Sequence, residues 1–382
     1  MSRSFPEAMV SDYPGKRLEL VDRQAQSLSY PRLMLKIVSP SGKSSSEFVF
    51  LIRYHQGFVH LINPRRSFAL ETGRNYQFTF LFPDGKCEHC RGKISYQMSG
   101  NGAFGILLRR PSTRFRNSMG QILFQSSSEH TPKKIRESGL LAGSLRHLVH
   151  YHIIETQEEY QELLALRFQA YQKAGKISAK GKIEDMGDRF DQRSKILVAK
   201  HLGKIVASMR LILNGEQEPG EHEQFVHFPH YFPSRSEIIE ITRVCTDPNY
   251  RGSDLLQGLF QFASKVTISL DRPWILGSST PALLPLYRKI GFLPSELKYI
   301  HQDLNHEAHV IFMAHKDDIL FGRNVGAIHW NVMYREVYEY ATAQEYGGEK
   351  QYADSMRIFF YMHLGTMMKI LKSSWKKIWH FK

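Results

Sequence analysis

The order of predicted elements in the second half of the sequence constrains the fold more than any other feature. A β-rich run over 237–244 enters the turn Asp247-Pro-Asn-Tyr-Arg-Gly252, and a helix is predicted over 253–267. A strand over 274–276 and a helix over 281–290 then repeat this order. Two successive strand–helix units predict an α/β domain whose helices cover a sheet.

The pattern before and after this stretch extends the same domain. Thr156, with Glu159 three residues later, forms a capping-box pattern that predicts the start of a helix. The remaining predicted strands of this domain are 151–154, 194–199, 205–210, 299–301 and 310–313. We therefore expect an α/β domain over 146–320, preceded by a linker over 126–145 and followed by a mostly helical extension over 321–382.

The first part of the chain has a different pattern. Predicted strands are 32–38, 48–52, 58–62, 76–82 and 105–108. Turn formers such as Pro83-Asp-Gly85 separate them without intervening helical periodicity, which favours a small antiparallel barrel over 30–125. Residues 1–29 are an N-terminal extension. The predicted fold class is therefore mixed α+β: a β-barrel, then an α/β domain with C-terminal helices.

Composition limits the class of protein. The chain has 382 residues, 42% of them hydrophobic, which is enough for two domains with real cores. Three cysteines cannot form a disulfide framework and suggest a reducing compartment. The first residues lack an apolar signal-peptide core, and no uncharged run is long enough to cross a bilayer. We expect a cytoplasmic protein.

The formal net charge is +14, from 51 Lys and Arg against 37 Asp and Glu. One interpretation is an acidic partner, such as acyl carrier protein or anionic lipid; the other is a generally basic surface. No zinc-finger spacing, aromatic RNA-binding signature or compact basic run favours nucleic acid. The last residues alternate Met367, Leu371 and Trp375 with lysines. This basic amphipathic stretch is either an interfacial membrane helix or a helix whose lysines face solvent.

The turn after the strand over 237–244 predicts an anion site. Its Pro and Gly end the extended backbone, and Ser253 or Asp254 begins the next helix. The free N–H groups and the dipole at a helix start favour a phosphate, and Arg251 adds positive charge. An ordinary turn between a strand and a helix is the alternative, because such turns are common in α/β domains.

Five stretches together resemble the GNAT acyltransferase superfamily, and within it the N-acyl amino acid synthases and acyl-homoserine-lactone synthases. The matching stretches are Leu166-Arg-Phe-Gln-Ala-Tyr171, Asp188-Arg-Phe-Asp191, Ser208-Met-Arg-Leu-Ile212, Glu240-Ile-Thr-Arg243 and Tyr287-Arg-Lys-Ile-Gly-Phe292. They lie between about residues 156 and 315. The resemblance implies a GNAT-type fold and transfer of an acyl group from a phosphopantetheine thioester, on acyl carrier protein or coenzyme A, to a small amine acceptor.

By position, the lactone-synthase signature implies substrate-binding roles for Arg167, Asp188, Asp191 and Arg210. An exposed loop charge pair is the alternative for the two aspartates. The predicted cofactor-binding residues are Val244, Cys245, Arg251, Gly252 and Ser253. No metal is expected.

Acyl transfer to an amine needs a base, a polarised carbonyl and a proton for the leaving thiolate. Glu240 is the candidate base, or else it pairs with Arg243 structurally. Arg243 is the candidate ligand for the acceptor's carboxylate, because a guanidinium matches a carboxylate bidentately. Backbone N–H groups at Val244 and Cys245 would polarise the thioester. Tyr287 is the candidate acid, with a packing aromatic as the alternative.

One departure from the superfamily affects the donor. Its phosphate loop is usually Arg/Gln-x-x-Gly-x-Gly/Ala, but Asp254 and Leu256 occupy the glycine positions here. Side chains at these positions hinder the close approach of a diphosphate that glycine permits. A carrier with a single phosphate tolerates this better, so acyl carrier protein is favoured as the donor over acyl-CoA.

Two further motifs are predicted to be inactive. Cys87-Glu-His-Cys90 has no second ligand pair at zinc-binding spacing, and it falls between predicted strands instead of at a helix start. Residues 30–125 resemble a PilZ barrel. That family's Asp/Asn-x-Ser-x-x-Gly motif would fall at Ile52 to Gly57, without its acid/amide and serine. We therefore expect a degenerate barrel that does not bind cyclic di-GMP.

The sequence thus predicts an N-acyltransferase that moves a fatty acyl group to the amine of an amino acid or similar acceptor. One alternative is an acetyl-CoA-dependent acetyltransferase. The other is a catalytically idle binding protein with a regulatory role.

Overall fold

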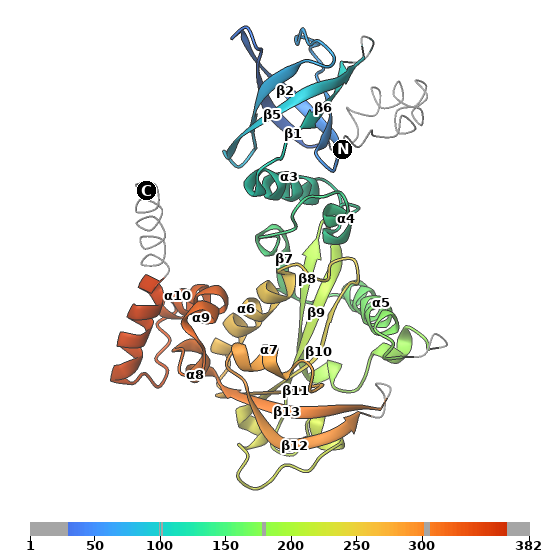
Figure 1. The fold of residues 1–382 in the computed structure, drawn as a ribbon. Helices are drawn as coiled ribbons and strands as arrows, with labels where there is room; N and C mark the ends of the chain where they lie inside the picture. The colour runs from blue at the N-terminus through green and yellow to red at the C-terminus, as the bar shows by residue number, and fades with distance from the viewer. Residues whose placement is uncertain (1–29, 99, 101, 178–180, 302–305, 365–382) are drawn as a thin grey trace. The chain divides into compact units, whose positions relative to one another are not determined.

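A computed structural model describes residues 30–98, 100, 102–177, 181–301 and 306–364 of the protein. The chain divides into two compact units between Leu148 and Val149. Figure 1 shows the elements of each unit along the chain.

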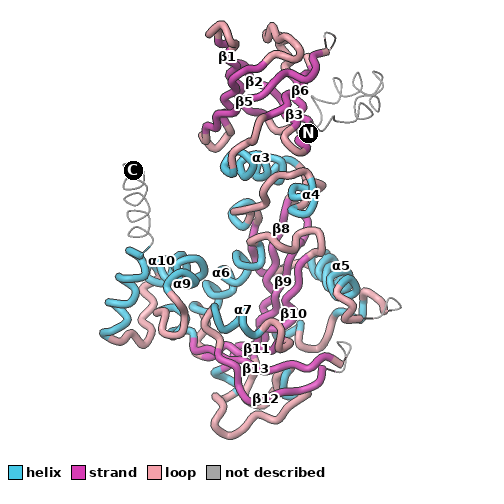
Figure 2. The backbone as a smooth tube through the Cα atoms, in the orientation of Figure 1, coloured by secondary structure: helices cyan, strands magenta, loops and turns pink. Residues whose placement is uncertain are grey.

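The first unit contains a closed antiparallel barrel of six strands in the order β1-β2-β3-β6-β5-β4 (Figure 2). The strands are β1 Arg32–Val38, β2 Ser44–His55, β3 Phe58–Ile62, β4 Asn75–Leu81, β5 Cys87–Gln97 and β6 Ala103–Leu108. Alternate residues point inward, as the side-chain period of two requires, so Leu35, Val49 and Phe80 are fully buried. The predicted barrel is present, while its PilZ resemblance stays a prediction.

The predicted linker over 126–145 is structured. Helix α3 (Thr113–Ser126) precedes it, and helix α4 (Pro132–Glu137) lies within it. Thr131 caps α4, Pro132 follows at its first position, and Ile135 is buried. Leu140 and Leu145 are also buried. The segment predicted as a linker therefore contains a helix and buried apolar residues, and its predicted bounds stay a prediction.

The second unit is built on a seven-stranded sheet in the order β12-β13-β11-β10-β9-β8-β7. Its strands are β7 His150–Ile153, β8 Ser194–His201, β9 Lys204–Leu213, β10 Ile238–Thr246, β11 Trp274–Ser279, β12 Leu293–His301 and β13 Glu307–His315. Only β10 and β11 are parallel neighbours; the other pairs are antiparallel. The fold class is mixed, with a GNAT-like α/β domain after the barrel, as predicted.

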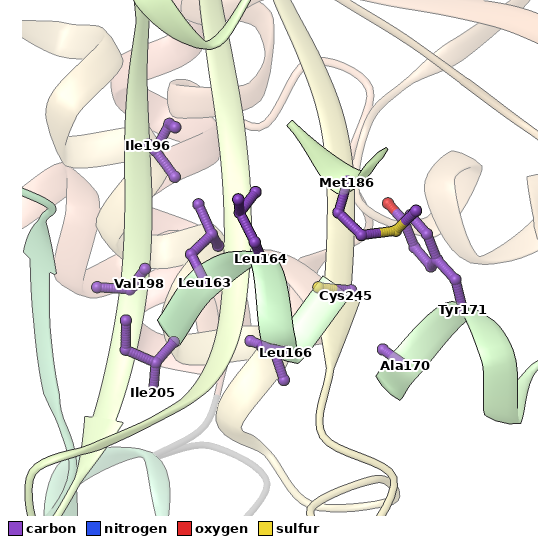
Figure 3. Close-up of a cluster of buried hydrophobic side chains, with 10 residues drawn as sticks. All are labelled: Leu163, Leu164, Leu166, Ala170, Tyr171, Met186, Ile196, Val198, Ile205 and Cys245. Carbon is purple, nitrogen blue, oxygen red and sulfur yellow. The ribbon is translucent and has the colours of Figure 1, made fainter. Parts of the chain in front are cut away.

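Helices α5 (Gln157–Lys173) and α6 (Leu255–Ile268) lie on opposite sides of strands β8 to β10 (Figure 1). Thr156 caps α5 by accepting from the Glu159 N–H at 3.2 Å, as the sequence predicts. Figure 3 shows the apolar face of α5 against the sheet. This cluster contains Leu163, Leu164, Leu166, Ala170, Tyr171, Met186, Ile196, Val198, Ile205 and Cys245.

Strands β10 and β11 separate part-way along their length. Their pairing runs from Ile238↔Trp274 to Ile241↔Gly277 and then stops, although β10 continues to Thr246 and β11 to Ser279. On its other side, β10 loses register with β9 between Thr242 and Cys245. This bulge and the splay leave the second half of β10 without a partner on the β11 side, which opens a gap in the sheet.

The chain after β13 continues as helices α8 (Lys316–Leu320), α9 (Ala327–Met333) and α10 (Arg335–Ala343), and residues 352–364 are also helical. Trp330 is fully buried, and its indole N–H donates to Leu320 O at 2.9 Å. The Tyr334 hydroxyl donates to Ile290 O at 2.6 Å, which ties these helices to the end of α7 (Leu284–Lys289). The predicted basic amphipathic stretch from Met367 onward lies outside the described residues.

Candidate active site

A cavity of about 350 Å³ fills the gap between β10 and β11. Part of its wall is apolar and includes Ile241, Leu256, Leu283 and Phe312. Another part of the wall carries polar side chains. They are Lys176, Glu221, His222, Ser278, Tyr299, His301 and His309. A thioester with a hydrocarbon tail and an amine acceptor with polar groups would meet surfaces of matching character here.

The bulge in β10 forms the middle of this cavity. Thr242, Arg243, Val244 and Cys245 all line it. Arg243 has a positive φ of 51°, which is uncommon for a residue with a side chain and turns the backbone out of the ladder. The register shift with β9 and the end of pairing with β11 coincide here. Val244 and Cys245 lie at this bulge, and the role of their backbone N–H groups in polarising a carbonyl oxygen stays a prediction.

The predicted phosphate end contains Arg251, which lines the cavity and donates to Ala170 O at 3.0 Å. Gly252 has a positive φ of 72°, so the turn uses a conformation that suits glycine. The Ser253 hydroxyl donates to Tyr250 O at 2.6 Å. Asp254 is the N-cap of α6 but makes no side-chain capping bond. An acidic side chain therefore stands at the helix start, where a phosphate would otherwise be favoured.

Tyr287 lines the cavity from α7. Its ring stacks on Phe312 with centroids 4.3 Å apart and meets Phe260 edge-on. Burial raises the pKa of Tyr287 to about 12, so the phenol keeps its proton at neutral pH. The predicted acid and the alternative packing role are thus both compatible with its position: the ring packs while the residue borders the cavity.

The predicted signature residues form one buried ionic network. Arg167 and Arg210 are fully buried, and Asp191 accepts from both, at 2.9 and 2.7 Å. Arg210 also pairs with Glu221 at 2.8 Å. Asp188 pairs with Arg210 and, at 3.0 Å, with Arg243. None of Arg167, Asp188, Asp191 and Arg210 lines the cavity, and their predicted substrate-binding role stays a prediction. They hold Glu221 and Arg243, which do line it.

This network fixes its own charge state. Burial alone would raise the pKa of Asp191, but Arg167 and Arg210 hold it at about 2. Burial likewise opposes the ionisation of Glu221, and Arg210 with Arg243 lowers its pKa to about 2. The three carboxylates are thus balanced by three guanidinium groups. Such a balance is required, because an unpaired buried charge is strongly destabilising.

Arg243 has hydrogen-bonding capacity left within this network. Its Nη2 donates to Asp188, but its Nε is buried without a hydrogen-bond partner, 3.8 Å from Glu221 Oε1. The exposed fraction of the Arg243 side chain is 16%, and the residue lines the cavity. The predicted role as a carboxylate ligand therefore stays a prediction that the geometry permits.

Glu240 differs from the prediction. It is fully buried and does not line the cavity, so it cannot reach an amine directly. It also does not pair with Arg243. Its Oε1 accepts from Asn214 Nδ2 at 2.6 Å, and its Oε2 lies 2.8 Å from Nδ1 of His222. Glu240 lies before the bulge, where β10 still pairs with both β9 and β11, whereas Thr242 and Val244 lie at the bulge and line the cavity.

His222 is the functional candidate that the sequence did not indicate. It lies in a short 3-10 helix, His222–Gln224, within the long loop between β9 and β10. It is buried and lines the cavity. The Glu221-His-Glu sequence around it has no recognised spacing. His222 is one of 18 histidines in the sequence, and it is its contact with Glu240 in the fold that distinguishes it.

The cysteines occupy separate environments. Cys87 is exposed and Cys90 is buried, on opposite faces of β5, so the motif lies within a strand instead of between strands as predicted. Cys245 is buried, which raises its pKa and agrees with a packing role. Over the ranges that the structure describes, no group of three His, Cys, Asp or Glu side chains is arranged to hold a metal ion.

Comparisons with known proteins find similarity to one segment of the second unit and to several solved structures. Residues 166–261 match the family model described as an acetyltransferase (GNAT) domain. The solved structures similar to the chain include FeeM, an N-acyl amino acid synthase from uncultured soil microbes, with 12% identity and a TM-score of 0.37 over 50% of this chain and 97% of FeeM. An acyl-CoA N-acyltransferase from Pseudomonas aeruginosa has 21% identity and a TM-score of 0.32, over 44% of this chain and 99% of its own. No curated protein matches the chain.

The matched segment contains the second half of α5, the hairpin β8–β9, strand β10 with its bulge, and the first half of α6. These elements build the splayed gap and one wall of its cavity. Within the second unit, residues 166–261 are therefore similar to a GNAT acetyltransferase domain.

Proposed function

We propose that the protein is an N-acyltransferase that moves a fatty acyl group from a phosphopantetheine thioester to the amine of an amino acid or related small acceptor. The observation that carries this proposal is the cavity at the splay of β10 and β11. It brings together the bulge of β10, a protonated Tyr287 and the guanidinium of Arg243. Acyl transfer needs these groups around one thioester.

The apolar part of the cavity wall suits a long acyl group. Ile241, Leu256, Leu283 and Phe312 line it, whereas an acetyl group would need little of this surface. Burial of each methylene stabilises binding by about 0.8 kcal/mol. A fatty chain is therefore favoured over acetate.

Acyl carrier protein is the proposed source of that chain, with acyl-CoA as the general co-substrate of the GNAT acetyltransferase family. Asp254 at the start of α6 places negative charge where the diphosphate of coenzyme A would lie. Arg251 lines the cavity and can meet a single phosphate. The net charge of +14 would attract an acidic carrier, and this attraction weakens with salt.

The acceptor is proposed to bind beside the polar part of the cavity wall. Arg243 lines the cavity with 16% of its side chain exposed, so its guanidinium can bind an acceptor carboxylate. Phe225 and Tyr299 also line the cavity, and their rings stack with centroids 4.9 Å apart. An amino acid presents both a carboxylate and an amine at the spacing of one carbon, which fits a compact polar chamber.

The test uses the purified full chain with three donors: acetyl-CoA, a long-chain acyl-CoA and the same acyl group on acyl carrier protein. Each is incubated with the standard amino acids, and products are identified by mass spectrometry. Fatty N-acyl amino acids formed fastest from the carrier protein are the expected result. Products from acetyl-CoA alone would support the acetyltransferase alternative. If no combination of donor and acceptor gives an amide, the result would support the alternative of a catalytically idle binding protein.

A contact with membrane lipid is proposed for the helical extension. The helix over 352–364 exposes Tyr352, Met356, Phe359 and Phe360, each between 51% and 86% exposed. Their spacing puts them on one side of the helix. The sequence that follows is rich in lysine and aromatic residues, a combination that binds anionic lipid surfaces. No helix among the described residues has the length and apolarity to cross a bilayer.

A further inference from the structure

The contact between His222 and Glu240 has the geometry of a catalytic pair. Nδ1 of His222 lies 2.8 Å from Oε2 of Glu240, and the His222 backbone N–H donates to the same oxygen at 3.2 Å. Asn214 donates to Oε1 at 2.6 Å. Glu240 is fully buried, while His222 borders the cavity. The imidazole therefore stands between a buried carboxylate and the space where substrates meet.

The chemistry of the contact assigns the proton on the ring. With Glu240 as a carboxylate, which only accepts hydrogen bonds, Nδ1 of His222 is the donor in this contact. Neutral imidazole then carries its lone pair on Nε2. Among the described residues, none hydrogen-bonds this nitrogen. Nε2 is thus the atom through which His222 can take a proton from a group in the cavity.

We propose that His222 is the base that deprotonates the acceptor amine, and that Glu240 is its positioning residue. This role rests on the proposed acyl transfer. The amine nitrogen attacks the thioester carbon, the carbon–nitrogen bond forms and the carbon–sulfur bond breaks. The proton lost by the amine goes to His222 Nε2, and the leaving thiolate takes a proton from Tyr287. Solvent then returns the His222 proton to Tyr287, so the protein ends unchanged.

The other basic side chains in the polar part of the cavity wall are less suited to the task. Burial, His301 and Lys176 lower the pKa of His309 to about 4, so it binds a proton poorly near neutral pH. Its Nδ1 lies 3.2 Å from the Ser278 hydroxyl. The Tyr299 hydroxyl lies 2.7 Å from the same Ser278 hydroxyl, and the Tyr299 ring packs edge-to-face with the His222 ring. Glu221 is held ionised by Arg210 and Arg243.

The charged and titratable groups around His222 come from several elements. They are Glu240 on β10, Glu221 on its own loop, Tyr299 and His301 on β12, and His309 on β13. The pH profile of the reaction therefore reports all of these groups together.

The experiment compares kcat/KM of the full chain with those of His222→Gln and Glu240→Gln, across pH 5 to 9. General base catalysis contributes about 10²–10⁴-fold, so His222→Gln should lose that factor together with the acid limb of the profile. Glu240→Gln keeps one oxygen that can accept from His222 but loses the negative charge, so it should shift the acid limb to lower pH, because the imidazolium loses its anionic partner. A purely structural Glu240 would leave the limb in place.

A matched control exists outside the cavity. His152 contacts Glu159 at the same 2.8 Å, and neither residue lines the cavity. His152→Gln should keep wild-type kcat/KM and profile. His222→Gln that folds, as judged by circular dichroism, and retains activity within about threefold of wild type overturns the role of His222 alone. A wild-type protein that forms no amide with any donor and acceptor overturns the proposed acyl transfer and this role together.

Discussion

Gly220 and Glu240 are in direct steric contact: a Cβ atom at residue 220 would overlap Oε1 of Glu240 and lie 2.6 Å from its Cδ. The same atom would lie 2.7 Å from Nδ2 of Asn214. Glycine is therefore required at this position for the carboxylate to reach His222 and Asn214 together. The contact links the loop before β10 to the strand that forms the cavity.

The substitution Gly220→Ala should displace the Glu240 carboxylate without removing any functional group. We expect kcat to fall by about 10-fold or more, with a loss of stability of about 1–3 kcal/mol from overpacking. Steady-state kinetics and thermal unfolding measure the two effects. Gly347→Ala is the control, because a Cβ there meets nothing within 4 Å. Equal kinetics for the two variants would show that the seating of Glu240 is unimportant.

Replacing Tyr287 with phenylalanine removes the proton donor but keeps the ring that stacks on Phe312. If the phenol protonates the leaving thiolate, kcat should fall by about 10²-fold while KM for the donor changes little. Stopped assays with an acyl thioester measure both constants. Tyr340→Phe, on α10 and outside the cavity lining, should behave as wild type. If the Tyr287→Phe enzyme has a normal kcat, the role of Tyr287 is packing and not proton donation.

Arg243→Gln tests the acceptor's carboxylate. The variant should raise KM for an amino acid by about 10–100-fold, because a charge-assisted hydrogen bond is lost, yet change KM for the corresponding methyl ester much less. Product formation with both acceptors gives the comparison. Equal losses for acid and ester would mean that Arg243 only supports Asp188 and Glu221.

Arg210→Met should destabilise the protein by about 3–5 kcal/mol, because it leaves Asp188, Asp191 and Glu221 with too few cations in a buried site. The midpoint of urea unfolding should fall accordingly. Arg335→Met removes an exposed pair with Glu339 and should cost less than about 1 kcal/mol. Similar midpoints for the two variants would contradict the importance assigned to the buried network.

Acid should unfold the second unit through the same network. The pKa values of Asp191 and Glu221 are about 2 in the folded protein and about 4 when unfolded. Depressed carboxyl pKa values give stability that is fully present above pH 4 and is lost as the pH falls towards 2. Each group contributes about 2–3 kcal/mol in this window. Urea unfolding at pH 7, 4 and 3 measures the loss, and a flat profile would contradict it.

The exposed face of the helix over 352–364 predicts lipid binding. The double substitution Phe359→Ser with Phe360→Ser should reduce cosedimentation with vesicles of anionic phospholipid several-fold, since both rings are more than half exposed. The variant should keep its fold, because Ile358 and Asp354 on the buried side are unchanged. Unaltered cosedimentation, or none by the wild type, would count against a membrane contact at this face.

Much of the secondary structure depends on interactions between neighbouring residues, so it could be predicted from the sequence alone. The cap at Thr156, the strand over 32–38 and the turn at 247–252 depend on a few neighbouring residues, so their spacing is informative. The sequence did not predict strand β5, because its Cys, His, Gly and charged residues give only a weak alternation of apolar and polar positions. The positions of Arg243, Val244, Cys245, Arg251 and Tyr287 on one cavity followed from the order of elements.

Tertiary packing decided the rest. Only the folded chain brings His222 from a long loop onto Glu240, and Arg167, Asp188 and Arg210 into one buried network. The buried position of Glu240 requires that residue 220 has no side chain, and the bulge that follows Glu240 in β10 forms only when the strand pairs with β9. Sequence determines the elements because their interactions are local; contacts between distant side chains arise only when those elements pack.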